Sequence, residues 1–532
     1  MKYIALTLGP ITRTIEMAEN TRSLWAASYL FSYLGKQIIQ PFKERKFLLP
    51  YISNEMFEKS FKGAGVFPDR YIFKAETISG KDDFDALTER VETVIHELAA
   101  SIGKVIRYDD RVIEAYLKKF FKVYFFEKDF KAENEKDIKK ACEKSLALLE
   151  MQDSVVPKVN DSMLFLNSFF DRVTNSFLAK DAGLEDGFQT IVKISSGDDV
   201  ETPKHPHQRY VAIVKADGDS MGKAFENVSD SNKLSQALFE FNKEAVKAIH
   251  AYNGLPVYIG GDDLLFFAPV YTTVKEKESA KQSSLFSLLQ ELDNKFHSCI
   301  KETELEEQPT LSFGVSITYY KYPMFEALKL ADSLLGKAKA GDSKNPKNNI
   351  VFSIQKHSGQ TRAALLHKGN ESTLLKFNTL TNDFMVTINE EEEEDGKEVD
   401  KKDDERKSDG KKVLASVMHG LREKEQLLTI ALEQESMLGN FFDNNYDEPV
   451  HKKYIKFFTD LKELLWASYQ EFSESDKLCR LEDSLPKNMM IKDIHSDKWI
   501  ATPEKAAIET AYNALQFVHL INQRNDERDE NL

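Results

Sequence analysis

The sequence predicts an α+β protein built from two ferredoxin-like domains, a helical linker and a helical C-terminal domain. Residues 1–130 and 204–358 each combine short apolar strands with long amphipathic helical stretches. Residues 131–203 and 359–532 show mainly the helical period of hydrophobic side chains. A length of 532 residues accommodates roughly three or four such domains, so these two patterns account for the whole chain.

The composition is that of an ordinary globular protein, with 41% apolar and 30% charged residues. No run of about 18 apolar residues occurs, so we expect no transmembrane helix and no membrane partner. The three cysteines, Cys142, Cys299 and Cys479, are far apart and form no CxxC pair. This spacing argues against disulfides and against a cysteine-rich zinc site, and it favours a reducing, cytoplasmic location.

The N-terminal domain begins with a strand-like run at residues 3–9, followed by a long helical stretch at 12–39. Further strand-like runs follow at 46–52 and 70–78, and helical periodicity separates them from another at 121–126. The opening strand, glycine-containing loop and long helix match the start of the second domain. The N-terminal domain is therefore interpreted as a degenerate copy of the second one.

The second domain shows the order β-α-β-β-α-β-α-β. A continuous apolar run at residues 210–216 predicts a buried central strand. Residues 255–270 form two apolar runs around the tetrapeptide Gly-Gly-Asp-Asp, which is typical of a β-hairpin. The core of this order is the split βαββαβ arrangement of ferredoxin-like palm domains.

Residues 389–411 are charged and almost free of apolar side chains, so we expect a disordered acidic loop within the helical C-terminal domain. From Glu390 to Asp409, 12 acidic and 5 basic residues give a net charge of −7, nearly half of the −15 of the chain. The rest of the chain is only mildly acidic. The net charge therefore does not exclude a nucleic-acid partner.

Three acidic residues are expected to meet at one edge of the second domain. Asp217 ends the central strand, and Asp262 and Asp263 lie at the hairpin tip. Because clustered carboxylates repel one another unless cations neutralise them, and because oxygen ligands suit Mg²⁺ or Mn²⁺, these residues predict a metal site. Two such ions support attack of a hydroxyl on an α-phosphate. Asp217, Asp262 and Asp263 are thus predicted to be both catalytic and metal-binding.

Residues around this cluster are predicted to bind a nucleotide. Glycines beside the acids let the backbone approach a phosphate, and Lys339, at the end of a helix over 324–340, offers positive charge to the β- and γ-phosphates. Each motif alone has an ordinary interpretation as a turn or as a solvated helix-end lysine. The predicted nucleotide-binding residues are Gly218, Asp219, Ser220, Gly260, Gly261, Lys339, Lys347 and, at an interface between the two palms, Ser28.

Several motifs together resemble one known family. They are KADGDSMGK (215–223), YIGGDDLLFF (258–267), FPDRYIF (67–73) and the N-terminal segment LTLGPITRTIEMAENTRSLWAASYLFSYL (6–34). These segments resemble the large polymerase–cyclase subunit of type III CRISPR effector complexes, particularly the Cmr-type (III-B) branch. The resemblance implies two GGDEF/cyclase-like palm domains, of which the first is degenerate.

The resemblance also implies a function and partners. It implies a complex with backbone, guide-tag-binding and small subunits, a guide CRISPR RNA and a target RNA. Binding of target RNA would activate a nucleotidyltransferase that uses ATP and Mg²⁺ or Mn²⁺ to make cyclic oligoadenylate. Asp262 and Asp263 match the signature carboxylates of the family, Asp217 its strand-end metal ligand and Lys339 its triphosphate-contacting lysine.

The sequence departs from the family pattern in two respects. None of the 11 histidines is followed by aspartate, so we expect no N-terminal HD nuclease domain and no DNA cleavage. A cysteine zinc module is also not expected. Three alternatives remain open, namely conjugation of AMP to S-adenosylmethionine as a second substrate, a stand-alone dinucleotide cyclase that uses GTP, and a catalytically silent scaffold that docks RNA and partners.

Overall fold

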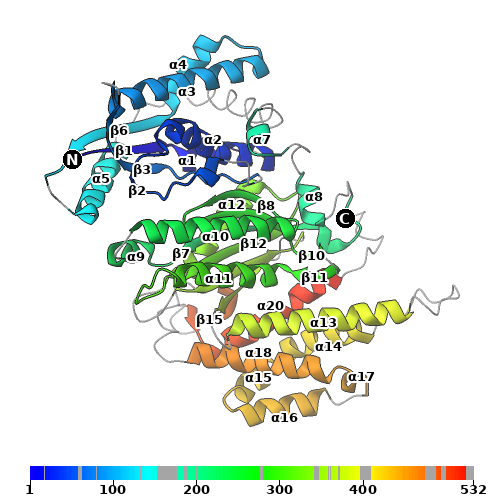
Figure 1. Ribbon diagram of the computed structural model, residues 1–532. Coiled ribbons are helices and arrows are strands. Elements are labelled where there is room, and N and C mark those ends of the chain that lie inside the picture. The colour runs from blue at the N-terminus through cyan, green and yellow to red at the C-terminus, as the bar shows by residue number, and fades with distance from the viewer. Residues whose placement is uncertain are drawn as a thin grey trace.

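The computed structural model shows three parts that follow one another along the chain and are stacked in space (Figure 1). It describes residues 1–16, 18, 20–57, 61, 63–78, 81–131, 134–151, 177–184, 190–197, 202–228, 231–275, 280–340, 347–357, 359, 361–368, 372–395, 409–446, 449–473, 487–492 and 499–522. No helix within these ranges is both long and apolar enough to cross a membrane.

The first part is a four-stranded antiparallel sheet with helices on both faces. Its strands, in the order β2-β3-β1-β6, are β1 (Lys2–Gly9), β2 (Phe47–Leu49), β3 (Arg70–Lys74) and β6 (Lys122–Asp129). Its helices are α1 (Ile11–Glu16), α2 (Thr21–Ile39), α3 (Asp83–Ile106), α4 (Asp110–Phe120) and α5 (Glu135–Glu150), and the short strands β4 (Thr77–Ile78) and β5 (Lys81–Asp82) pair separately.

The alternation of side chains along β1 determines where these helices pack. Ile4 and Leu6 face the core shared with α2, α3 and α4. Tyr3 and Ala5 face the opposite core, which is formed with α5. The helix at the start of the predicted linker therefore covers a face of the first sheet.

The segment predicted as one helix over residues 12–39 forms two. Asn20 is the N-cap of α2, because its side chain accepts a hydrogen bond from the backbone N–H of Ser23 at 2.8 Å and the Ser23 hydroxyl caps the backbone N–H of Asn20 in return. Such a reciprocal cap starts a new helix at this position.

The second part is a six-stranded sheet with the predicted central strand. Its strands, in the order β14-β13-β12-β7-β9-β8, are β7 (Tyr210–Gly218), β8 (Leu255–Gly260), β9 (Asp263–Pro269), β12 (Leu311–Tyr319), β13 (Asn349–Gln355) and β14 (Thr361–His367). Numbered within each sheet along the chain, the first four strands of both sheets are arranged 2-3-1-4. The predicted fold class with two ferredoxin-like domains is confirmed.

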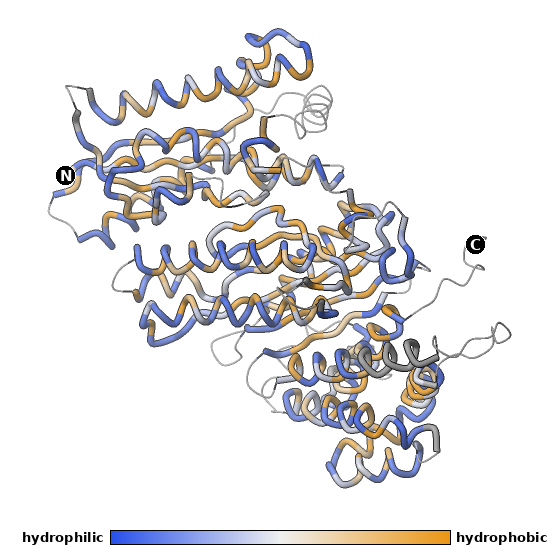
Figure 2. Tube along the Cα trace, turned by 45° about the vertical axis from the view of Figure 1, so that its right-hand side comes forward, coloured by the Kyte–Doolittle hydropathy of each residue, from blue (hydrophilic) through white to orange (hydrophobic). Residues whose placement is uncertain are grey.

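Helices cover both faces of the second sheet. Ala212 and Val214 of β7 pack in the core formed by α10 (Ser231–Ala251) and α11 (Leu285–Lys301). Val211 and Ile213 point to the other face, which is covered by α12 (Met324–Ala338). Figure 2 shows hydrophobic residues running along the strands between these helical layers. The helix α9 (Met221–Asn227) follows β7 directly.

The first domain packs against the edge strand β8. Leu24 of α2 shares a core with Leu255 and Val257 of β8. On the other side of that strand, Phe61 from the first domain contacts the ring of Phe239 of α10, with centroids 5.4 Å apart. The first domain therefore contacts the second through hydrophobic residues on both sides of β8, the strand that leads into the acidic turn.

The second sheet extends beyond the residue range that the sequence predicted. Ala364, Leu365 and Leu366 of β14 are fully buried beside β13, although residue 358 was the predicted end of the domain. Their alanine- and leucine-rich sequence has helical propensity, and only pairing with β13 makes this segment a strand. A separate hairpin of β10 (Tyr271–Lys275) and β11 (Ala280–Ser284) also follows β9.

The third part is helical, as predicted. Its helices are α13 (Thr373–Asp395), α14 (Asp409–Glu423), α15 (Glu425–Ala431), α16 (Glu435–Asn445), α17 (Pro449–Lys452), α18 (Ile455–Ser473) and α20 (Pro503–Asn522), with a small sheet of β15 (Met490–Lys492) and β16 (Trp499–Ala501). Between the first and second parts, the described helices are α7 (Phe177–Asp181) and α8 (Ile191–Ser196).

The predicted disordered loop over residues 389–411 is wrong at both ends. Helix α13 continues to Asp395, and α14 begins at Asp409. Glutamates are good helix formers, so a helix that begins in the buried core can continue into an acidic run. The remainder of the predicted loop, 396–408, lies outside the described residues.

Candidate active site

The end of β7 and the β8–β9 turn meet at one edge of the second sheet. Asp217 pairs with Ser312 of β12, while Gly260 and Asp263 close the neighbouring turn. A Cβ atom added at Gly218 would lie 2.7 Å from the Cβ of Asp262, which is too close for any side chain. The backbone after Asp217 therefore lies directly against Asp262, as predicted from the strand order.

The acidic turn depends on a glycine and on a buried asparagine. Gly261 has a φ of +63°, in the left-handed region that favours glycine. Asn242 of α10 is 3% exposed, and its side-chain amide makes two hydrogen bonds to Gly261. With the amide oriented so that each of its atoms meets a complementary partner, its nitrogen donates to the Gly261 carbonyl at 2.9 Å, and its oxygen accepts from the Gly261 N–H at 3.0 Å. The turn is thereby fixed to a core helix.

Replacing Asn242 with alanine is expected to lower both stability and catalysis. The change leaves the N–H and carbonyl of Gly261 without their partners, at a cost of about 1–3 kcal/mol. Movement of the turn by about 1 Å is expected to reduce turnover roughly 100-fold. Thermal unfolding and steady-state kinetics would measure the two effects. Asn378→Ala is the control, because Asn378 is equally buried but its amide donates to the Phe286 carbonyl. Equal losses of turnover in both variants would contradict the assignment.

The acidic residues of the turn have raised pKa values. Burial, and then the negative charge of Asp217, raise the pKa of Asp262 to about 6. Burial, and then the charges of Asp262 and Asp217, raise the pKa of Asp263 to about 7, while Lys339 acts in the opposite direction. The Asp263 carboxylate is packed among neighbouring groups of the turn, but part of its side chain is exposed, so water screens its repulsion more than that of Asp262. Full ionisation of this cluster therefore favours the binding of a further cation.

In the absence of divalent cations, Asp262 and Asp263 are expected to contribute stability that increases as the pH falls from about 8 to about 5, whereas partly buried His207, whose pKa is lowered to about 4, acts in the opposite direction. The folded-state pKa values of Asp262 and Asp263 lie above the ordinary aspartate value of 3.8, so the folded state binds more protons in this window, and this stabilisation is lost as the pH rises through about 6 to 7. Unfolding midpoints measured across this range, with and without Mg²⁺, would show whether the cation flattens the dependence. The variant Asp262→Asn/Asp263→Asn should have a smaller slope than the wild type, and an unchanged slope would contradict the assignment.

Lys339 reaches the carboxylates from the end of α12. It is the C-cap of α12, and its ammonium forms an ion pair with the Asp217 carboxylate and donates to the Gly218 carbonyl at 3.1 Å. Asp217 and Lys215 point to the same face of β7, and Lys215 pairs with Asp332 of α12 at 2.7 Å. The structure thus brings Lys339 together with the three predicted carboxylates.

Asp219, predicted to bind a nucleotide, instead faces the interior. It is 3% exposed, and one carboxylate oxygen accepts hydrogen bonds from the hydroxyls of Thr310 and Ser312, both at 2.7 Å. The next residue, Ser220, is exposed and has a φ of +61° at the start of α9. Asp219 therefore holds the loop from within, whereas Ser220 is open to solvent.

The remaining predicted residues differ in their relation to the cluster. Gly260 ends β8 against the hydroxyl of Tyr258, which would lie 2.7 Å from an added Cβ atom. Lys347 is half-buried before β13, and contact with the carboxylates remains a prediction. Ser28 is buried in α2, the helix that packs on β8, and its hydroxyl has no hydrogen-bond partner in the described part of the chain. Its role in binding a nucleotide also remains a prediction.

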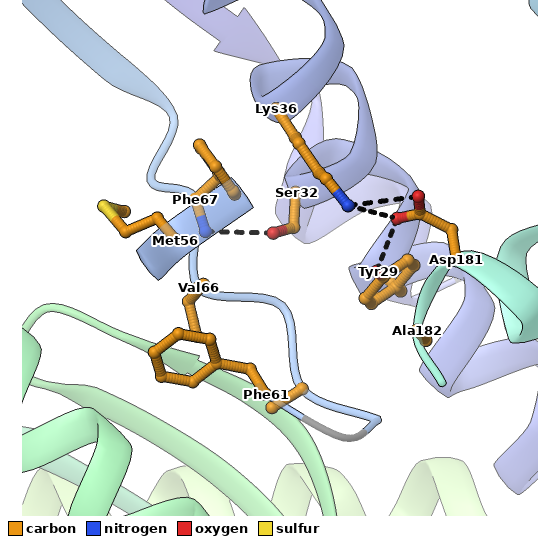
Figure 3. A pocket seen from close by; sticks show the side chains of 10 residues that line it. Tyr29, Ser32, Lys36, Met56, Phe61, Val66, Phe67, Asp181 and Ala182 are labelled. Atoms are coloured by element: carbon orange, nitrogen blue, oxygen red, sulfur yellow. Dashed lines mark hydrogen bonds and ion pairs between the residues drawn. The ribbon is translucent and has the colours of Figure 1, made fainter. Parts of the chain in front are cut away.

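A pocket in the first domain lies beside α2 (Figure 3). Its hollow is about 320 Å³, including the space at its mouth. Asp181 accepts hydrogen bonds from the Tyr29 hydroxyl at 2.8 Å and from the Lys36 ammonium at 3.1 Å, and Ser32 accepts one from the backbone N–H of Phe67. These polar groups pair with one another across the pocket. Their contacts fasten α7 and the segment before β3 to α2.

Two residues near the turn were not predicted from the sequence. Asn242 lies within an ordinary amphipathic helix, and no local pattern distinguishes it from a solvated asparagine. Asp69, just before β3, contributes negative charge that raises the pKa values of Asp263 and Tyr258. Its segment, FPDRYIF, had been noted for its resemblance, but the resemblance assigned it no role. Asp69 shows that the first domain contributes to the electrostatics of the turn.

Two segments of the chain match known domain families. Residues 3–146 match the N-terminal domain of the CRISPR-associated protein Cmr2. Residues 210–350 match the second palm domain of Cas10/Cmr2. Together these segments cover more than half of the chain, and they correspond to the first sheet with its helices and to the second sheet up to β13.

Individual proteins are also similar to this chain. The CRISPR system Cmr subunit Cmr2 of Pyrococcus furiosus is 27% identical over 214 residues, which are 39% of this chain and 22% of that protein. The match thus spans about a fifth of the length of that relative. A chain of the apo type III-B Cmr-beta complex has a TM-score of 0.51 at 11% identity, covering 84% of this chain and 77% of that one.

A Csm1–Csm4 cassette in complex with cA4 covers 97% of this chain and 69% of the matched chain, with a TM-score of 0.47 and 11% identity. The family is shown by the two domain matches, which occur in the expected order on the two observed sheets. The chain therefore belongs to the Cas10/Cmr2 family of type III CRISPR large subunits, on its Cmr-type (III-B) branch.

Proposed function

We propose that this chain is the nucleotidyltransferase subunit of an RNA-guided type III-B effector complex, which target RNA activates to convert ATP into a cyclic oligoadenylate. In each bond-forming step, a 3′-hydroxyl oxygen attacks an α-phosphorus and pyrophosphate leaves. The observation that carries this proposal is the meeting of Asp217, Asp262 and Asp263 with Lys339 at one edge of the second sheet.

The carboxylates fit a site for Mg²⁺ or Mn²⁺. Their oxygens suit these ions, and the raised pKa values of Asp262 and Asp263 show that their joint ionisation is unfavourable without more positive charge. As the side chains stand, no three His, Cys, Asp or Glu side chains in the described ranges are arranged to hold an ion. The Lys339 ammonium lies against Asp217 instead. When bound, two divalent ions would supply activation of the hydroxyl and charge stabilisation of the pyrophosphate.

The chain's own groups position the nucleotide. Gly218 has no side chain of its own, which lets the β7–α9 loop lie directly against Asp262 beside the proposed phosphate site. The flexible side chain of Lys339 can move its ammonium from the Asp217 carboxylate to a phosphate, because both groups are anionic. Asn242 and Asp219 hold the two loops from the interior.

Membership of the family supports the proposed partners. The relative from Pyrococcus furiosus is named as a subunit of a Cmr system. By analogy, this chain would assemble with the backbone, guide-tag-binding and small subunits, a guide RNA and a target RNA, in the cytoplasm. Without that assembly we expect little activity.

Identification of the product tests the proposal. The assembled complex, with target RNA, Mg²⁺ or Mn²⁺ and labelled ATP, should yield cyclic oligoadenylate and pyrophosphate by mass spectrometry. The variant Asp262→Asn/Asp263→Asn should yield neither. The same product profile from both proteins would show that the catalytic assignment is wrong.

Parallel reactions distinguish the alternatives. A product formed only when S-adenosylmethionine is added would identify conjugation of AMP instead of cyclisation. Consumption of GTP without RNA would identify a stand-alone cyclase. An assembled complex that binds target RNA but consumes no nucleotide would identify a scaffold.

A further inference from the structure

The carboxylate of Asp219 lies at the centre of a buried network behind the catalytic edge. Besides the two hydroxyl donors, the same oxygen accepts a hydrogen bond from the backbone N–H of Asn348 at 2.9 Å. The backbone N–H of Asp219 donates to the Thr310 carbonyl at 2.6 Å. One carboxylate thus joins the end of β7 to the starts of β12 and β13.

Asn348 and Asn349 extend this network toward Lys339. The side-chain amide of Asn349 donates to the Ala338 carbonyl at 3.1 Å, and Ala338 immediately precedes Lys339. Because Asn348 donates its N–H to Asp219, the start of β13 connects the loop after Asp217 to the end of α12. The relative position of Asp217 and Lys339 therefore depends on contacts that begin at Asp219.

Lys368 connects the same network to α11 of the second domain. Its side chain is 1% exposed, and its ammonium pairs with Asp293 of α11 and donates to the Leu311 carbonyl. The negative charge of Asp219 also acts on this ammonium. The backbone carbonyl of Lys368 accepts from the Asn348 side chain at 2.9 Å. Shortly after Lys368 the chain enters α13, where the backbone N–H of Thr373 donates to Glu471 of α18 at 2.9 Å.

We propose that Asp219 is a positioning residue that couples α11 and the starts of β12 and β13, through Asn348 and Lys368, to the strand end that carries Asp217. A buried carboxylate with three donors on one oxygen tolerates little movement of any donor, since each lost bond leaves a buried polar group unpaired. The proposal rests on the proposed function for its kinetic consequence. Its structural consequence can be measured without any reaction.

Asp219→Asn tests the structural consequence first. Asparagine keeps the shape, but its neutral amide oxygen is a weaker acceptor for the three donors than the carboxylate oxygen. Hydrogen exchange of the full-length chain should show faster exchange of the Asp219 and Asn348 amides, by about 10-fold. Asp460→Asn is the matched control, because Asp460 is a buried carboxylate of α18 outside this network, and it should leave these amides unchanged. Unchanged exchange at Asn348 in Asp219→Asn would overturn the proposal.

Kinetics of the assembled, RNA-activated complex test the coupling. Asp219→Asn should lower kcat about 100-fold while KM for ATP stays within about threefold, since the phosphate-binding groups remain and only their alignment changes. Lys368→Met should also lower kcat, and the double variant should lose less than the product of the two single losses. A kcat within threefold of the wild type in Asp219→Asn, or fully multiplicative losses, would overturn the proposal.

A substitute variant and two comparisons distinguish failure of the positioning role from failure of the proposed function. If Asp219→Asn does not fold, Ser312→Ala removes one donor without changing a buried charge, and it should lower kcat about 10-fold with the same constant KM. If the wild type makes no nucleotide product but Asp219→Asn still accelerates exchange at Asn348, the positioning role stands and the proposed function fails. If the wild type is active and neither exchange nor kcat changes, the positioning role fails alone.

Discussion

Replacing Asp217 with asparagine is expected to abolish nucleotide synthesis, with a loss of at least about 1,000-fold, while leaving the folded chain at least as stable as the wild type. Asp217 is the carboxylate that β7 contributes to the edge, and it lies opposite the two acids of the turn. A missing negative ligand for a divalent ion costs about 4 kcal/mol or more of transition-state stabilisation, which corresponds to this factor.

The expected stability of Asp217→Asn follows from the loss of repulsion between Asp217 and the two acids of the turn. The charge of Asp217 contributes to the raised pKa values of both Asp262 and Asp263, so its removal relieves an unfavourable interaction in the folded state. The loss of the ion pair with Lys339 offsets only part of this relief, because the ammonium keeps its bond to the Gly218 carbonyl and remains near the other two acids.

Product yield and the thermal unfolding midpoint, measured in cation-free buffer, would test both parts. Asp332→Asn is the control, because Asp332 is an exposed carboxylate that pairs with Lys215 on the same face of the domain. It should change neither quantity appreciably. An Asp217→Asn variant that retains more than a tenth of the wild-type activity would contradict the assigned role.

Replacing Lys339 with methionine is expected to have opposite effects on two ligands. Its ammonium forms an ion pair with Asp217, so it competes with a divalent cation for that carboxylate. The variant should therefore bind Mn²⁺ more tightly, by about 10-fold, in the absence of ATP. It should also show a KM for ATP raised about 10-fold and a kcat lowered about 10-fold, because the phosphates lose a positive partner.

Electron paramagnetic resonance of Mn²⁺ binding, together with steady-state kinetics, separates these effects. Lys329→Met, which removes an exposed lysine from the same helix, is the control. If Lys339→Met binds Mn²⁺ no more tightly than this control, Lys339 does not compete for the site. If KM for ATP is unchanged, its contact with the triphosphate is disproved.

The sequence correctly indicated the two sheets because their signals are local and periodic. The apolar run of β7 and the apolar pair of strands around the turn are short runs of strand-forming residues bounded by turn residues. The order βαββ then requires the first strand to lie beside the hairpin. This is why the approach of Asp217 to Asp262 could be predicted without coordinates.

Other features depended on contacts between distant segments. β14 has helix-forming residues, and its pairing with β13 overrides their propensity. The acidic residues at the end of α13 extend a helix that starts in the hydrophobic core, so their low hydrophobicity did not indicate its end. In both cases a local rule competed with packing, and packing prevailed.

The sequence by itself determined which residues form the acidic edge, because strand order and turn chemistry are encoded over short distances. Only the tertiary structure decided what holds that edge in place. Asn242 of α10 is hydrogen-bonded to the turn. Asp219, which was predicted to bind a nucleotide, is hydrogen-bonded in the interior. Lys339, at the end of α12, forms an ion pair with Asp217. These arrangements depend on side-chain direction and on burial across elements far apart in the chain, which the order of residues alone does not specify.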